Sequence, residues 1–508
     1  MPAFANCHNS SLATSFAAEW LSTCLALSNQ PREREITMLD SKSRSLQDMI
    51  DRVPDLVIHF RSTPAAPHNR NKPGPSPVPA EFSNWRDEQR AWRETAILFD
   101  QSHHMPELFL EGPDALKLLS HLGVNSLANF APGRARQYVG VNHAGKIIGE
   151  SIVHCLGSNR FELISGMHLQ DWVAFNAETG GYDVSVKRDY QTSANSEGRT
   201  NFRFGMDGPN AERIFYDVIT GEAPKISFFH TAMVEIAGAQ VMALRHGMAG
   251  HFGVELSGPY AAGPMVRAAL LAAGQKHGLK PGGRLAYFST GGEGGWWAYP
   301  IPAIYTDERM RAFREWLPET SWAGQIQLAG SFISSNIEDY YVSPWDIGLN
   351  RVMKFDHDFV GREALEKMAD RPHRSKVTLV WNKDDVAAIQ RSMFEAGIPY
   401  KYIEFPTASY GFPQTDKVCA KDGKLVGMAG FSGYSVNEAA MLSLASVDAD
   451  HAVEGSEVIL TWGEPDSGSR KPHVEFHRQY QVRCTVASAP YAAAAREMRA
   501  AKADKGVA

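Results

Sequence analysis

The stretch RHGMAGHFGVELSGPY, residues 245–260, most constrains the fold because it joins a glycine-rich turn to an apolar strand. The strand carries one carboxylate, Glu255, and the turn holds three glycines spaced three residues apart, Gly247, Gly250 and Gly253. A carboxylate is costly to bury without a partner. We therefore expect Glu255 to meet either an arginine of the same chain or a ligand with paired N–H donors, such as a pterin or guanine ring.

The composition excludes several classes of protein. The chain has 508 residues, is 44% hydrophobic and 21% charged, and has a net charge of −6. No basic block predicts nucleic-acid binding, and no apolar run approaches the roughly 18 residues that cross a bilayer. The five cysteines are scattered and form no C-x-x-C pair, which argues against a disulfide framework or a structural zinc site. We expect a cytoplasmic protein.

The distribution of helix and strand patterns along the chain predicts an α+β protein with several domains. We expect residues 1–44 to be a poorly ordered extension. Residues 62–80 are rich in proline, so we expect them to be extended. After residue 375, strands alternate with turn signals, which predicts a small β domain, a barrel in form. Residues 489–508 are expected to be a frayed helix and a disordered tail.

Periodicity and turn residues place individual elements. Apolar residues at helical spacing predict helices within 45–60, 113–123 and 306–318. Residues 137–166 are typical of successive hairpins. YIEFPTASYG, residues 402–411, is expected to be a strand of the β domain.

The glycine-rich stretch STGGEGGWW, residues 289–297, lacks the features of a phosphate-binding loop. We interpret it as a tight loop that allows close approach of another group. Trp296 and Trp297 then either face a flat ligand or cover the edge of a core, and the sequence does not decide between these two.

The pair of histidines in LFDQSHHM, residues 98–105, does not predict a metal site. Successive residues of a strand point to opposite faces, so His103 and His104 cannot easily bind one ion. On a strand, Gln101 and His103 share one face and His104 takes the other. A bend before Pro106 would be needed to bring Gln101 and His104 to the same ligand.

Several motifs in the same order resemble the glycine-cleavage T-protein (aminomethyltransferase) family. They are the glycine motif that runs from Arg245 to Glu255, LFDQSHHM followed by GPDALKLL, DFVGREAL at 358–365, and GKLVGMAGFSGYSVNEAAMLSLASV at 423–447. The likeness extends from about residue 82 to about residue 485. EFSNWRDEQRAWRETAILFDQSHHM, PAIYTDERMRAFREWLP and GSFISSNIEDYYV resemble one subgroup, the tetrahydrofolate-dependent aromatic O-demethylases of the vanillate and syringate type.

The resemblance implies three domains around a central folate cavity. The first comprises residues 45–99 and 190–290, and the second comprises residues 100–189 and 291–375. Residues 376–488 then form the C-terminal β domain.

The resemblance also implies roles for individual residues. Glu255 would anchor the pterin ring and Trp296 would pack against the folate. Tyr287 and His104 would be catalytic, and Gln101, His103 and His104 would lie near the aromatic substrate, with His104 favoured over His103. No metal ligand is implied.

The implied reaction transfers a methyl group from a methoxylated aromatic acid to N5 of tetrahydrofolate, as in the breakdown of lignin aromatics. The implied partners are small molecules. An aminomethyltransferase of glycine cleavage is the alternative, but Ser126 stands where that activity usually has an acidic residue. A non-catalytic folate-binding protein is a second alternative, although the K-G-C-Y motif of such sensors is absent from the sequence. Gly166 replaces an arginine that holds the substrate carboxylate in some demethylases.

Overall fold

The structure is a computed structural model, and it describes residues 44–62, 77–248, 250–297, 300–465, 468 and 470–503. The expected N-terminal extension up to residue 43, most of the proline-rich stretch and the last five residues lie outside this described part. The following account concerns the compact unit Ser45–Ala508.

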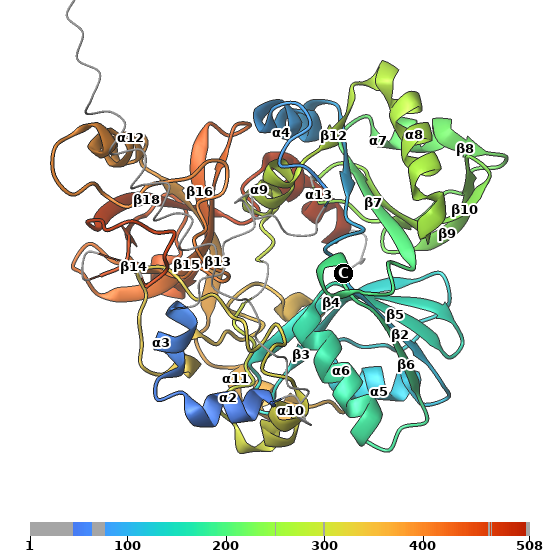
Figure 1. Cartoon of the computed structure of the whole chain (residues 1–508), viewed down its shortest axis with the longest axis horizontal. Helices are drawn as coiled ribbons and strands as arrows, with labels where there is room; N and C mark the ends of the chain where they lie inside the picture. The colour runs from blue at the N-terminus through green and yellow to red at the C-terminus, as the bar shows by residue number, and fades with distance from the viewer. Residues whose placement is uncertain are drawn as a thin grey trace, which may run out of the picture. The chain divides into compact units, whose positions relative to one another are not determined.

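A seven-stranded sheet, drawn in blue and green in Figure 1, is assembled from distant parts of the chain. β1 lies inside it, parallel to β12 and antiparallel to β7. In spatial order its strands are β12 (Leu279–Gly282), β1 (Ala96–Asp100), β7 (Asn201–Asp207), β11 (Gly253–Pro259), β10 (Ala239–Arg245), β9 (Thr231–Ile236) and β8 (Ile219–Thr220).

A five-stranded antiparallel sheet comes from the intervening residues and is cyan in Figure 1. The hairpins that the sequence predicts are confirmed, because β3 pairs with β4 and β4 with β5. Its strands are, in order, β3 (Ala135–Val141), β4 (Ile147–Gly157), β5 (Arg160–Ile164), β2 (Glu107–Glu111) and β6 (Ser185–Asp189).

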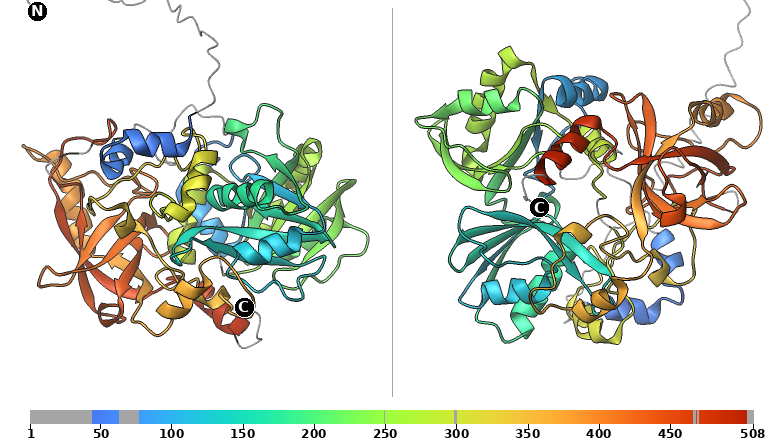
Figure 2. Two further views of the ribbon diagram at one scale, coloured as in Figure 1. Left: turned by 90° about the horizontal axis from the view of Figure 1, so that it is seen from below. Right: turned by 180° about the vertical axis from the view of Figure 1, so that it is seen from behind.

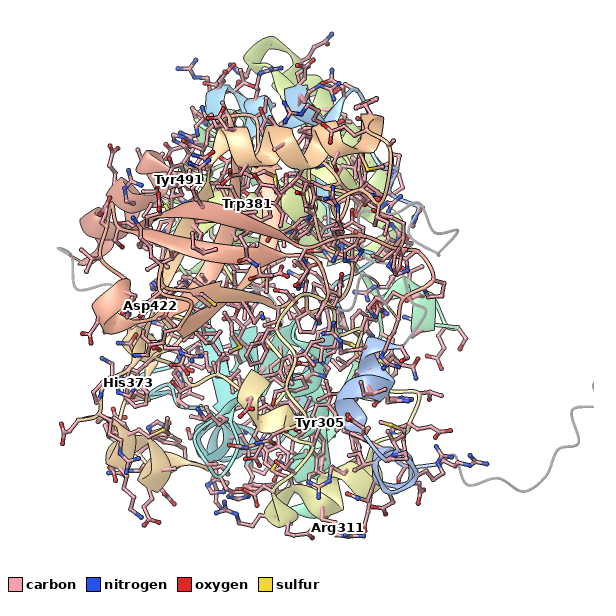
Figure 3. All side chains as sticks on the ribbon, turned by 90° about the vertical axis from the view of Figure 1, so that its left-hand side faces the viewer. Tyr305, Arg311, His373, Trp381, Asp422 and Tyr491 are labelled. Atoms are coloured by element: carbon pink, nitrogen blue, oxygen red, sulfur yellow. The ribbon has the colours of Figure 1, made fainter. Side chains whose placement is uncertain are left out.

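The C-terminal strands close into a barrel, as the sequence predicts. Inside it Trp381 (Figure 3) packs edge to face against Trp462, with ring centroids 5.3 Å apart. The prediction of a strand at 402–411 is wrong. This segment makes isolated backbone hydrogen bonds, for example from the Ala408 amide to the Ser432 carbonyl, and does not form a continuous ladder with a neighbouring strand. The barrel order is β13 (Arg374–Trp381), β16 (Ala440–Asp448), β15 (Leu425–Ser435), β14 (Asp416–Cys419), β17 (Glu457–Trp462) and β18 (Tyr480–Ser488).

Helices cover the sheets and join them. α7 and α8 pack on the seven-stranded sheet, α5 packs on α6 beside β4, and α9 lies against α4 and the barrel strands β15 and β16. The α-helices are α2 (Leu46–Arg52), α3 (Leu56–Arg61), α4 (Trp85–Glu94), α5 (Ala115–Leu122), α6 (Met167–Thr179), α7 (Ala211–Val218), α8 (Gly263–Gly274), α9 (Arg284–Gly294), α10 (Arg311–Trp316), α11 (Arg362–Met368), α12 (Lys383–Arg391) and α13 (Ala493–Ala503).

Helix α9 corrects one expectation. Most of the stretch 289–297, which we interpreted as a loop, continues this helix through Gly294. The glycines serve close packing instead, because a Cβ on Gly291 would lie 2.4 Å from the Phe431 ring. The close approach that we expected is therefore made by a helix.

The C-terminal helix α13 packs beside the end of α9, as Figure 2 shows from behind. The amide of Ala492 donates to the carbonyl of Glu293, and Pro490 lies against Gly295. A Cβ on Gly250 would lie 2.3 Å from the backbone of Ala495, so α13 also lies on the glycine-rich turn.

The α+β class is confirmed. Helices α2 and α3 contribute Leu46 and Phe60 to the core that also contains residues of the five-stranded sheet, such as Leu108. The exact domain boundaries stay a prediction. Among the described residues, no helix combines the length and the apolar character that crossing a bilayer requires.

Candidate active site

The seven-stranded sheet presents Glu255 on the face opposite to its helices. The register pairs Phe99 with Gly205 and Gly205 with Glu255, so these residues point the same way in one row. The next residue on each strand faces the core beneath α7 and α8, namely Leu98, Phe204 and Leu256. This buried row is therefore separate from the hydrophobic core beneath α7 and α8.

The glycine-rich turn is folded around Asp207. The Met248 amide donates to Asp207 Oδ1 over 2.9 Å, and a Cβ on Gly253 would lie only 2.3 Å from the same oxygen. Arg245 closes the turn by donating to the Gly253 carbonyl at 2.9 Å while its guanidinium stacks on Phe252. The turn thus fixes the position at which β11 begins, and with it the place of Glu255.

Glu255 is buried, with 6% of its surface exposed, and one of its oxygens is satisfied by the protein. Oε1 lies 3.0 Å from Nδ1 of His246. Within the described part of the chain, Oε2 has no hydrogen-bond partner. Burial acts to raise the pKa of this carboxyl, but the bond from His246 and the charges of His246, Arg203 and His154 bring it below its usual value. Glu255 is therefore an anion with one oxygen available to a donor.

An ion cluster beside Glu255 links the two sheets. Arg203 of β7 donates to Glu107 of β2 at 2.8 Å and to Glu162 of β5 at 3.0 Å. All three side chains are almost fully buried. His154 lies 3.3 Å from Glu162. The carboxylates raise the pKa of Arg203 despite its burial, so the guanidinium of Arg203 stays charged close to Glu255.

Residues 102–104 form a turn at the end of β1, which contradicts the expectation that the histidines lie on a strand. The turn brings Gln101 and His104 to the same side chain, Tyr287 of α9. Gln101 Nε2 donates to the Tyr287 hydroxyl over 3.4 Å, and the His104 and Tyr287 rings lie 4.8 Å apart. The Phe99 ring meets Tyr287 edge to face at 5.1 Å.

His103 faces a different part of the molecule. Its Nδ1 lies 2.9 Å from Thr192 Oγ1, and its ring meets Tyr260 edge to face at 6.2 Å. Burial lowers the pKa of His103. The structure therefore brings together Gln101, His104 and Tyr287 and leaves His103 with the loop before β7.

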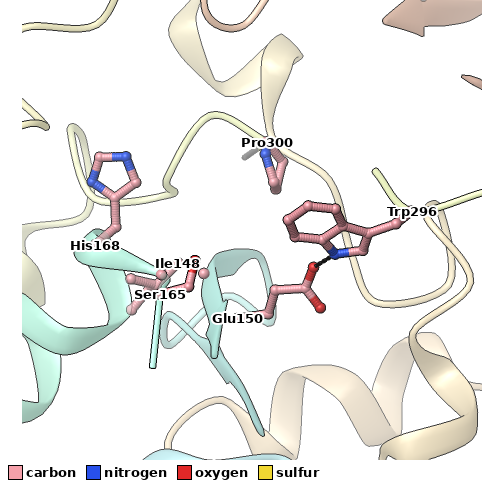
Figure 4. Close-up of a pocket in the computed structure, with 8 residues that line it drawn as sticks. Ile148, Glu150, Ser165, His168, Trp296 and Pro300 are labelled. Carbon is pink, nitrogen blue, oxygen red and sulfur yellow. Dashed lines mark hydrogen bonds between the residues drawn. The ribbon is translucent and has the colours of Figure 1, made fainter. Parts of the chain in front are cut away.

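Trp296 lines a small pocket beside the five-stranded sheet (Figure 4). Its indole N–H donates to Glu150 of β4, and Ser165, His168 and Pro300 also line the pocket. Burial raises the pKa of Glu150, although the bonds from Trp296 and Gln137 oppose this effect. Of the two tryptophans, Trp297 lies in a core, whereas Trp296 is 37% exposed. The contact of Trp296 with a flat ligand stays a prediction.

Three residues of the site escaped the sequence reasoning. His246 stands inside the glycine motif, but only the fold of the turn points it at Glu255. Arg203 and Glu150 lie on strands outside the motifs that carry the family resemblance. The sequence indicated only that a buried Glu255 needs a partner. The partner within the protein is His246, whereas we expected an arginine or a ligand.

Comparison with known proteins gives long matches. The family model of the GCVT N-terminal domain matches residues 71–300. Syringate O-demethylase of Sphingobium sp. (strain SYK-6) is 45% identical over 455 residues, which cover 89% of this chain and 97% of that protein. Sesamin methylene transferase of Sinomonas sp. (strain No.22) is 30% identical over 433 residues, covering 82% and 90% of the two chains.

A solved structure agrees with the fold. The crystal structure of the glycine cleavage system aminomethyltransferase T from Bartonella henselae superposes with a TM-score of 0.55 at 17% identity, and the match covers 85% of this chain and 95% of that one. At this identity the likeness concerns the fold. Together with the long sequence matches, it means that the chain belongs to the glycine-cleavage T-protein (aminomethyltransferase) family, in the group that includes syringate O-demethylase.

Proposed function

We propose that the protein is a methyltransferase that demethylates a methoxylated aromatic acid of the syringate, vanillate or 3-O-methylgallate class. The methyl group passes to N5 of tetrahydrofolate, and the products are the phenol and 5-methyltetrahydrofolate. The observation that carries the proposal is the 45% identity to syringate O-demethylase over 97% of that protein. The breakdown of lignin-derived aromatics in the cytoplasm is the setting that we propose.

The described residues fit tetrahydrofolate. Glu255 Oε2 and Gln101 Oε1 are buried oxygens without hydrogen-bond partners in the described part of the chain. Such acceptors are costly unless a ligand supplies donors, and a pterin ring presents paired N–H groups. Glu255 would hold the ring, and we assign Trp296 to packing against the remainder of the folate. When bound, tetrahydrofolate supplies the nitrogen that accepts the methyl group.

Tyr287 is suited to assist the leaving group. An aryl oxide leaves poorly, and a tyrosine hydroxyl has a proton affinity similar to that of the phenol that forms. Because the Tyr287 oxygen accepts from Gln101, its hydrogen can be donated toward the ether oxygen as the C–O bond breaks. The tyrosinate would then take up the proton that is released when N5 is methylated. His104 packs on the Tyr287 ring and would orient both this ring and the substrate. Methyl transfer is an in-line displacement, so such positioning is the main catalytic requirement.

The substrate carboxylate needs an anchor other than residue 166. Gly166 has a φ of +68°, and a Cβ there would lie 1.9 Å from the Glu150 carbonyl oxygen. This backbone excludes the arginine of related demethylases. The anchoring residue therefore differs from theirs, which favours a difference in substrate preference.

Aminomethyl transfer is the less supported alternative. Ser126 replaces the usual acidic residue, and the aminomethyltransferase of Lysinibacillus sphaericus is 25% identical over 387 residues, well below the syringate enzyme.

A panel assay tests the proposal. Purified protein is incubated with syringate, vanillate and 3-O-methylgallate, with and without tetrahydrofolate, and the phenols and 5-methyltetrahydrofolate are measured by chromatography. We expect equimolar phenol and 5-methyltetrahydrofolate from at least one substrate, strictly dependent on tetrahydrofolate. If every substrate remains unchanged while the protein is folded, the proposed activity is wrong.

A further inference from the structure

His246 occupies the first position after β10, where the chain turns into the glycine-rich segment. Its Nδ1 lies 3.0 Å from Glu255 Oε1. This is the one hydrogen bond from the described residues to the Glu255 carboxylate. The two residues start from neighbouring antiparallel strands, so the bond spans the turn that separates them.

The imidazole ring of His246 also contacts two aromatic rings. Phe229 meets it at 5.2 Å with an interplanar angle of 67°, and Phe228 meets it at 6.2 Å. The Phe229 amide donates to the Arg245 carbonyl and the Phe229 carbonyl accepts from Ala135. The aromatic pair is thus fixed to both sheets, and it limits the orientations of the His246 ring.

The other charges near Glu255 act at longer range. Arg203 of β7 and His154 of β4 lower the pKa of Glu255 through their charge, and Glu162 faces the same cluster from β5. The Arg203 guanidinium donates its hydrogen bonds to Glu107 and Glu162 rather than to Glu255. These groups favour the anion but do not fix its orientation.

We propose that His246 is a positioning residue for folate binding, which donates from Nδ1 to Glu255 Oε1 and thereby directs Oε2 toward the pterin N–H groups. The inference rests on the proposed function and goes beyond it by naming the residue that orients the anchor. With Oε1 fixed, the carboxylate plane is fixed, and a ligand does not have to order it on binding. Without His246, the carboxylate keeps its burial and loses its bonded partner.

Two substitutions separate the hydrogen bond from the packing. His246→Phe keeps a ring against Phe228 and Phe229 but removes the donor. His246→Asn places an amide nitrogen near the position of Nδ1 and so keeps a donor. His357→Asn is the matched control, because Nδ1 of the partly buried His357 likewise lies 2.9 Å from a carboxylate oxygen, that of Asp356. Circular dichroism and thermal melting first establish that each variant is folded.

The binding of tetrahydrofolate and of 5-methyltetrahydrofolate is then measured by calorimetry between pH 6 and 8. We expect His246→Phe to weaken both ligands by about tenfold or more, the scale of one charge-assisted hydrogen bond. His246→Asn should stay within about threefold of the wild-type affinity. In steady state, His246→Phe should raise KM for tetrahydrofolate more than it lowers kcat.

The pH profile distinguishes positioning from a merely structural role. The pKa of Glu255 lies below its usual value partly because of His246, so it rises when His246 is removed while burial remains. The affinity of His246→Phe should therefore begin to fall at a higher pH than that of the wild type on acidification. A folded His246→Phe variant with unchanged affinity and pH profile would overturn the positioning role and leave the proposed function standing. A wild-type protein that binds neither folate would overturn both.

Discussion

At the scale of single residues, Tyr287 is the side chain on which the candidate chemistry depends. Its hydroxyl accepts from Gln101 and its ring packs on His104 and Phe99. Tyr287→Phe removes the hydroxyl and keeps the ring, so folate affinity should be unchanged while kcat falls by about 10²- to 10⁴-fold, the range of a general acid. Single-turnover kinetics check this. The control is Tyr402→Phe, at a partly exposed tyrosine of the barrel domain, which should retain full activity. Full activity of Tyr287→Phe would contradict the catalytic role of Tyr287.

The two adjacent histidines should respond differently to the same change. His104 lies 4.8 Å from Tyr287, whereas His103 is bonded to Thr192. We expect His104→Gln to lower kcat/KM for the aromatic substrate by at least about tenfold, because a misplaced catalytic group costs that much or more. His103→Gln should keep the kinetics and change the melting temperature instead. Equal kinetic losses in both variants would contradict the division.

The sequence could predict the demand of Glu255 for a partner, because burial of a carboxylate carries a known cost. It could not predict the partner, because His246 reaches Glu255 only through the fold of a turn around Asp207. Likewise, alternation predicts that adjacent histidines diverge, but not that residues 102–104 form a turn. Local sequence patterns predict that a buried charge requires a partner, whereas the identity of the partner depends on tertiary contacts.

At the scale of elements, helix α9 positions Tyr287 through its glycines. A Cβ on Gly291 would lie 2.4 Å from the Phe431 ring, whereas the nearest atom to a Cβ on Gly292 is 4.0 Å away. Gly291→Ala should therefore lower the free energy of unfolding by about 1–3 kcal/mol through overpacking. Gly292→Ala, its neighbour in the same helix, should be neutral or raise it by up to about 1 kcal/mol through helix propensity. Urea titrations of both variants check the contrast, and equal effects would contradict it.

The elements that the sequence predicted well are those with clear periodicity and clear turns. The hairpins of β3, β4 and β5 and the helix α5 belong to this class. α9 was missed because glycine is unfavourable inside a helix, and the advantage of close packing against the barrel is invisible in the local sequence. The segment 402–411 has the composition of a strand, yet in the described structure it makes only isolated bridges and no continuous pairing with a neighbouring strand.

At the scale of the whole molecule, the cluster around Arg203 joins the two sheets. Arg203→Met would leave Glu107 and Glu162 buried without their common partner, so we expect a loss of about 3–5 kcal/mol in the free energy of unfolding. Lys367→Met, which breaks the exposed pair with Glu363, should change it by no more than about 0.5 kcal/mol. Chemical denaturation measures both, and similar losses would show that the cluster does not stabilise the packing of the sheets.

Because β1 is inserted between β12 and β7, it has consequences for the order of events during synthesis. Residues 96–100 leave the ribosome early, but their parallel neighbour, residues 279–282, is not yet translated. The row that carries Glu255 is therefore incomplete until residue 282 has emerged. The turn at Gly250 is covered still later, by α13 at residues 493–503. Ribosome-bound chains that stop short of α13 should accordingly leave the turn at Gly250 uncovered, even where both sheets have already formed.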